Sequence, residues 1–168
     1  MKYTSAEAAK LLRKLMEEYS SLMDREIRTS VFTVSIDENP EEVRPSYDFK
    51  AVQIKLSDIE RKIRTIKHAM NQFNVSTVVD GFDMTIDQML IYIPQLNERK
   101  RKLAVMASRL PKERAVSYSR NAIIEYAYAN YSIEDAEAEL ETVSEELSKA
   151  QIALDVTNNS VQFEINLD

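Results

Sequence analysis

The stretch FKAVQIKLSDIERKIRTIKHAMNQF, residues 49–73, decides the fold of this 168-residue chain. Its apolar positions alternate in spacing between three and four residues without a break: Phe49, Val52, Leu56, Ile59, Ile63, Ile66, Met70 and Phe73. That spacing is the a/d pattern of a left-handed coiled coil. At 1.5 Å per residue, such a helix is about 40 Å long. A helix of this length needs a partner helix of similar length to cover its apolar side.

A second run with the same phase lies in the last third of the chain. It consists of Ile133, Ala136, Leu140, Val143, Leu147, Ala150, Leu154 and Thr157. Because its members match those of the first run position for position, half a chain length apart, a duplication of residues 1–84 as residues 85–168 explains the pattern. Two unrelated helices with similar ends explain it as well. In both runs an asparagine follows, Asn74 or Asn158, and we expect it to cap the helix in a left-handed conformation.

Two further helices are expected to partner these runs. Thr4 begins a capping box that predicts a helix ending near residue 28, and Thr85 begins another that predicts a helix as far as residue 110. Pro94 predicts either a kink in the later helix or a start closer to this proline. Lys100 occupies an a/d position, where a polar residue typically specifies register or oligomeric state.

Short strands are predicted between and after the helices, at residues 31–36, 75–79, 123–131 and 161–167. The dipeptide Asp80-Gly81 favours a tight turn after the second of them. The expected fold class is therefore α+β, mainly α. Four long helices form antiparallel, coiled-coil-like hairpins within a single domain, residues 1–168, and the strands lie at the helix ends or pair with another subunit.

The composition excludes several kinds of chemistry. With one glycine, no cysteine and one histidine, His68, the chain holds no phosphate-binding glycine loop, no disulfide, no cysteine-based metal site and no two-histidine motif. We expect no catalytic residue, no cofactor and no metal. Apolar runs are far shorter than the roughly 20 residues that span a bilayer, and the first residues do not resemble a signal peptide. We expect a cytoplasmic protein.

Two charged segments oppose each other in sign. Residues 99–114 hold seven basic side chains, and residues 134–146 hold seven acidic ones and no basic one. The basic segment suggests nucleic-acid binding, but no aromatic residue is interleaved for base stacking and the formal net charge of the chain is −6. We favour antiparallel packing of the two helices, which brings the opposite charges together and matches both helix dipoles.

One resemblance adds to this. The sequence AMNQFN at residues 69–74, followed by Asp80-Gly81, Thr85 and the basic run at 99–102, resembles the septicolysin-like bacterial proteins of unknown function. The likeness covers residues 66–168. It implies a helical-hairpin fold that assembles into oligomers, and it implies no established activity. Some members carry a cytolysin name.

The residues point to no substrate. We expect a non-enzymatic structural or interaction protein that forms a homo-oligomer through helical seams and strand edges. The alternatives are a membrane-active, cytolysin-like assembly and a nucleic-acid-binding protein that uses residues 99–114. The candidate interface residues are Ile59, Ile63, Ile66, Lys100, Tyr126, Tyr128, Leu140, Val143 and Leu147.

Overall fold

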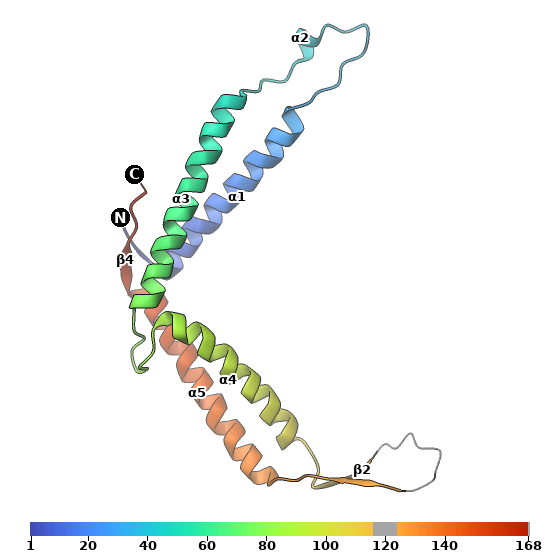
Figure 1. Cartoon of the computed structure of the whole chain (residues 1–168), viewed down its shortest axis with the longest axis vertical. Coiled ribbons are helices and arrows are strands. Elements are labelled where there is room, and N and C mark those ends of the chain that lie inside the picture. Colours follow the sequence, from blue (N-terminus) through green and yellow to red (C-terminus); the bar gives the residue numbers. More distant parts are fainter. Residues whose placement is uncertain (116–123, 168) are drawn as a thin grey trace. The chain divides into compact units, whose positions relative to one another are not determined.

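The computed structural model describes residues 1–115 and 124–167 (Figure 1). The helices in these ranges are α1 (Ser5–Thr29), α2 (Pro40–Val43), α3 (Phe49–Ser76), α4 (Ile86–Ala107) and α5 (Ile133–Ser160). The strands are β1 (Lys2–Thr4), β2 (Lys112–Arg114), β3 (Tyr126–Tyr128) and β4 (Gln162–Glu164). The expected class, mainly α with short strands, is confirmed. The single-turn helix α2 was not expected; it begins where Asn39 caps a Pro40 in the first turn.

The chain divides into two compact units. Unit 1 contains Met1–Asn74 and the C-terminal residues from Asn158 onward, and unit 2 contains Val75–Thr157. Each unit is built around two long helices, α1 with α3 or α4 with α5, which run side by side in Figure 1. The units differ from the predicted halves, because the segment that follows α3 belongs to unit 2 and the segment that follows α5 belongs to unit 1.

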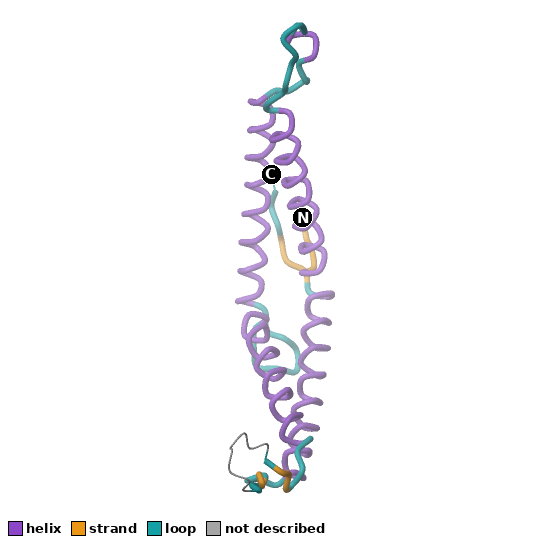
Figure 2. The backbone as a smooth tube through the Cα atoms, turned by 90° about the vertical axis from the view of Figure 1, so that its right-hand side faces the viewer, coloured by secondary structure: helices purple, strands orange, loops and turns teal. Residues whose placement is uncertain are grey.

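In unit 1 the two ends of the chain pair with each other. Strands β1 and β4 are antiparallel, with Tyr3 opposite Phe163 (Figure 2). Thr4 ends β1 and opens α1 through the predicted capping box. The Phe163 ring stacks on Phe73 of α3, with 4.4 Å between ring centroids. The segment after α5 thus covers the end of the α1–α3 pair.

Unit 2 repeats this arrangement with shorter pairing. The segment after α3 meets the start of α4 in a bridge between Val78 and Thr85, and Thr85 opens α4 through its own capping box. The turn between them contains Gly81 at φ 78°, a conformation that side chains other than glycine rarely adopt. At the other end of the unit, β2 and β3 form an antiparallel ribbon with Glu113 opposite Ala127.

Three local expectations are wrong. Residues 31–36 form no strand, because β propensity needs a neighbouring strand to pair with and the described part of unit 1 offers none there. Asn74 and Asn158 are not left-handed caps: both lie inside helices that continue for two more residues, and no described residue except glycine has positive φ. The helix with Pro94 does not start close to the proline, because α4 begins at Ile86 and contains it; the other expectation, a kink, stays a prediction.

Candidate assembly interface

Within unit 1, polar contacts join α1 to α3 along their length. Lys55 Nζ lies 2.9 Å from Glu18 Oε1, and the Tyr19 hydroxyl donates to Glu60 Oε1 at 3.1 Å. The hydrogen bond and the charge of Lys55 lower the pKa of Glu18, and the hydrogen bond to Glu60 raises the pKa of Tyr19. Gln53, early in α3, donates to Glu26, late in α1, whereas Ala8 at the start of α1 clusters with Ile66 further along α3, so the two helices are antiparallel.

Polar contacts also join α4 to α5 in unit 2, and these helices are antiparallel as well. Arg99 forms an ion pair and hydrogen bond with Glu139, and the Tyr92 hydroxyl donates to Glu146. This bond raises the pKa of Tyr92. The basic part of α4 therefore lies beside the acidic part of α5, as the charge pattern predicts. Arg99–Glu139 is the one ion pair between these two helices among the described residues.

The two ion pairs occupy corresponding positions. The bounds of α3 and α5 differ by 84 residues, and the capping threonines Thr4 and Thr85 differ by 81. With these offsets, Glu18 corresponds to Arg99 and Lys55 corresponds to Glu139. Each unit thus closes its hairpin with an ion pair at the same level, but the signs of the two partners are exchanged.

A pair of tyrosines shows the same correspondence. Tyr47, just before α3, donates to Glu26 Oε1 at 2.6 Å, and this bond raises the pKa of Tyr47 to about 12. Its counterpart Tyr131, just before α5, donates to the carbonyl oxygen of Met106 at 2.8 Å. Both hydroxyls therefore tie the start of the second helix to the last turns of the first.

The buried core layer nearest the capped starts of α1 and α4 also consists of residues at corresponding positions in the two units. In unit 1 it contains Ala8 and Ile66, which cluster with Ile165, and in unit 2 the corresponding residues are Met89 and Ala150. The four layer residues are 0% exposed. The small residue lies on the first helix in unit 1 and on the second helix in unit 2. The volume of the layer is therefore conserved although the individual side chains are not.

The predicted interface residues separate into three groups. Four are buried inside their own hairpin, namely Ile59, Ile66, Val143 and Leu147. Two are half-buried, Ile63 and Leu140, and three are exposed, Lys100, Tyr126 and Tyr128. Ile63 lines a groove of about 310 Å³ beside Met16 and Tyr19. Several of the predicted interface residues at a/d positions are therefore buried inside their own hairpin. Only residues at the margin of the buried seam, such as Ile63, remain accessible to another chain.

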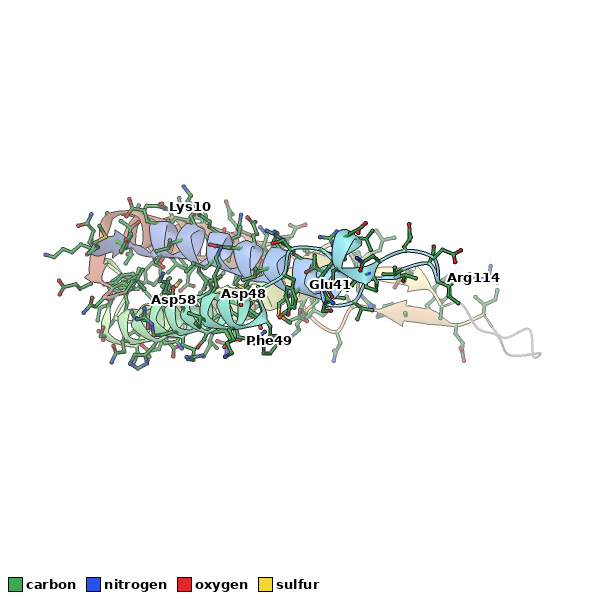
Figure 3. The ribbon with its side chains drawn as sticks, turned by 90° about the horizontal axis from the view of Figure 1, so that it is seen from above. Lys10, Glu41, Asp48, Phe49, Asp58 and Arg114 are labelled. Carbon is green, nitrogen blue, oxygen red and sulfur yellow. The ribbon has the colours of Figure 1, made fainter. Side chains whose placement is uncertain are left out.

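Exposed apolar side chains outside the a/d pattern were missed by the sequence reasoning. On the helices they are Ile27, Ile54, Leu90, Ile91, Val105, Ile152 and Val156, and Ile54 is 72% exposed. These fall between the a/d positions, so a search for the coiled-coil period overlooks them; a count of apolar residues on the outer helix faces is the signal that finds them. Val31 and Ile36 lie outside the helices, and Phe49, an a/d residue beside Asp48 where α3 begins, is itself 60% exposed (Figure 3).

The total surface is large for the mass. The chain exposes 12604 Å². Two folded units of about half of 19.4 kDa each are expected to expose about 10,200 Å² together, so the excess is about 2,400 Å². The excess arises because each long helix packs against one other long helix of its unit, which leaves most of its circumference in solvent.

The basic segment is largely engaged within the chain. Arg101 pairs with Glu98, and Lys112 Nζ lies 4.1 Å from the ring centroid of Tyr126 and 5.3 Å from that of Tyr128. An open groove of about 720 Å³ runs along α4 and is lined by Gln95, Glu98, Arg99, Arg101, Lys102, Val105, Met106, Arg109 and Tyr131.

Nothing among residues 1–115 and 124–167 assembles a reactive centre that we can identify. His68 is exposed on α3. No group of three or more histidine, cysteine or acidic residues in this part of the chain is placed to hold a metal ion. Of the described helices, none has the length and apolar character needed to cross a membrane.

Comparison with known proteins adds a fold relative. No family model matches the chain, and a search of curated proteins finds no match either. The chain is similar to a crystal structure of a functionally unknown conserved protein from Corynebacterium diphtheriae, with 16% sequence identity and a TM-score of 0.59. The match covers 98% of this chain and 100% of the other. At this identity the likeness shows a shared fold, and it carries no function to this chain.

Proposed function

We propose that the chain is a non-enzymatic, cytoplasmic structural or interaction protein that assembles with copies of itself. The exposed surface carries this proposal. The excess of about 2,400 Å² is comparable with the roughly 1,000–2,500 Å² that one obligate interface removes from each partner. The area is therefore sufficient for at least one extensive contact with another copy.

The character of the surface supports the same proposal. Large apolar side chains such as Ile54 and Ile91 lie in solvent on the outer faces of helices in both units. The groove beside Met16 and Ile63 lies at the margin of the α1–α3 seam. Burial of such groups against a second copy is favourable by roughly 25 cal/mol per Å² of apolar surface. We propose that coiled-coil-like seams provide the contacts within each hairpin and that their margins contribute to contacts between copies.

We also propose that the chain arose by internal duplication. The corresponding ion pairs, tyrosine bonds and core layers support this, as do two orphaned polar atoms. The buried side-chain oxygens of Asn74 and Asn158 occupy corresponding positions, and both lack a hydrogen-bond partner. Unrelated helical pairs have no reason to share so many positions at constant offsets.

Membership in the septicolysin-like family remains part of the proposal. It rests on the motif at residues 69–74 and on the hairpin architecture that this family implies. Under this proposal the assembly itself is the function, and the cytolysin name of some members is not transferred.

Light scattering coupled to size-exclusion chromatography tests the proposal. We expect a mass that is a multiple of 19.4 kDa and that persists on dilution. A mass of one chain at every accessible concentration would refute self-assembly. Two further assays address the alternatives: salt-sensitive retention on heparin would favour nucleic-acid binding, and release of dye from anionic liposomes would favour membrane activity. We expect neither.

A further inference from the structure

A short segment of unit 1 outside the helices and strands has main-chain groups without hydrogen bonds. We call residues 31–36, VFTVSI, the tip segment; it follows α1. In the described structure, the main-chain groups of residues 31–34 make no hydrogen bond. At its ends, Val31 is 78% exposed and Ile36 is 99% exposed. A segment rich in β-branched residues whose N–H and C=O groups are free at residues 31–34 is suited to strand addition.

The ribbon β2–β3 in unit 2 offers a free edge. The Ala115 N–H donates to the Glu125 carbonyl and the Ala129 N–H donates to the Pro111 carbonyl, so the odd-numbered positions bond across the ribbon. In an antiparallel ladder the intervening residue then directs its N–H and C=O outward. On β2 these residues are Lys112 and Arg114; all six residues of the two strands are exposed, and Arg114 lies at the end of β2 (Figure 3).

The two elements carry opposite charge. Residues 37–44, which follow the tip segment, hold four acidic residues and one basic residue, Arg44. Residues 109–114 hold three basic residues and one acidic residue, Glu113, which lies 3.9 Å from Arg109; Lys112 and Arg114 form no ion pair among the described residues. Since Glu41 already pairs with Arg44 at 2.6 Å, the other three acidic side chains of residues 37–44 have no ion-pair partner among the described residues. Opposite charges at a strand pair favour association and select its orientation.

We propose that the tip segment of one copy adds to β2 of a second copy as an antiparallel third strand. The inference rests on the proposed self-assembly and names the contact that performs it. Val34 lies opposite Lys112 and Phe32 opposite Arg114 as hydrogen-bonded pairs. This register directs Asp37, in the turn that Ser35 and Glu38 close, toward Arg109, which precedes β2. A parallel strand moves Asp37 away from Arg109, so the charges favour the antiparallel orientation.

Such a contact joins different surfaces of the two copies. Each chain carries one tip segment and one ribbon, so it contacts one neighbour through each. A contact of this kind builds a ring when the rotation closes and a filament when it does not. It also removes a liability, because an exposed strand edge promotes uncontrolled pairing unless another element covers it.

Disulfide trapping tests the pairing, because the chain contains no cysteine and each introduced thiol is unique. In the proposed register Thr33 and Glu113 form a non-hydrogen-bonded pair, whose Cα atoms are about 4.5 Å apart and suit a disulfide. Thr33→Cys and Glu113→Cys are made in separate chains, mixed under unfolding conditions, refolded and oxidised. We expect a cross-linked dimer of the two different chains. Lys67→Cys, at an exposed polar position on α3, replaces Thr33→Cys in the control mixture and is expected not to cross-link with Glu113→Cys.

Two proline variants test the main-chain bonds. Val34→Pro removes an N–H that the register directs to Lys112 and is expected to weaken association about tenfold. Thr33→Pro removes an N–H that faces solvent in the added strand and is expected to leave association within about twofold. Neither residue uses its N–H within the chain, so the circular dichroism spectrum of both variants should match that of the parent.

The outcomes separate the inference from the proposed function. An oligomer by light scattering without cross-linking above the control would overturn the strand addition and leave self-assembly intact. Equal weakening by the two prolines would also overturn it. A monomer by light scattering would refute self-assembly, and the inference with it.

Discussion

The buried layer of unit 1 allows a quantitative test of the correspondence between the two units. Ile66→Ala removes about three CH₂-sized groups, worth roughly 2.4 kcal/mol of transfer free energy, and leaves a cavity among side chains from several segments of the unit. We expect a loss of about 3–4 kcal/mol in the free energy of unfolding. Ala8→Met alone overfills the layer and should cost about 1–3 kcal/mol.

The double variant gives unit 1 the residue order of unit 2, where Met89 and Ala150 are buried at the positions that correspond to Ala8 and Ile66. Because the total volume is then nearly conserved, we expect a cost below about 1.5 kcal/mol instead of the roughly 4–7 kcal/mol that the single changes add up to. Urea unfolding followed by far-ultraviolet circular dichroism measures all three variants. The protomer concentration is held constant, since self-association contributes to the measured stability.

Additive single costs, within about 0.5 kcal/mol, would refute the reasoning, because they would mean that the two residues do not share one layer. Lys67→Ala serves as the matched control. Lys67 follows Ile66 on the same helix and is exposed, so its truncation is expected to change the free energy of unfolding by less than about 0.5 kcal/mol.

The remaining predictions concern charge, pH and burial. Arg99→Glu should lower the unfolding midpoint and Arg99→Glu with Glu139→Arg should restore it, as the reversed order in unit 1 implies; equal midpoints for the single and the double variant in urea would contradict this. The bond to Glu26 raises the pKa of Tyr47 from 10 to about 12, so its contribution to the free energy of unfolding is complete below the unfolded pKa and falls between pH 10 and 12. Tyr47→Phe should flatten this decline of the free energy of unfolding with pH, as measured by urea unfolding. An unchanged slope would exclude the bond. Leu147→Asp, at a 5% exposed position, should prevent folding by placing a charge in the seam, which circular dichroism would reveal, and a native-like helical spectrum would disprove the burial.

Much of the local structure could be predicted from residue order. The unbroken three-and-four spacing predicted α3 and α5, because side chains at these intervals share one helix face. The capping threonines predicted where α1 and α4 begin, because a hydroxyl and a partner three residues later satisfy free N–H groups locally. Such signals depend only on neighbours along the chain.

The candidate site was predictable only in part. Burial of Ile66 and Leu147 followed from the period, whereas the exposure of Lys100 did not, although all three occupy a/d positions. A two-helix hairpin covers only the near side of each helix. Whether an a/d side chain is buried therefore depends on the residue that lies opposite it on the other helix. Ala8 opposite Ile66 and Met89 at the corresponding level in unit 2 show that this partner is set across the hairpin, beyond the reach of any local pattern.

The sequence by itself therefore determined the helices, their capped starts and the absence of glycine- or cysteine-based chemistry. The tertiary structure decided that β1 pairs with β4, that the segment after α3 meets the start of α4, and that residues 31–36 stay unpaired despite their β-branched side chains. The physical reason is that helices satisfy their main chain within a few residues, whereas strands and buried layers require partners far away in the chain, and these are chosen by packing and register.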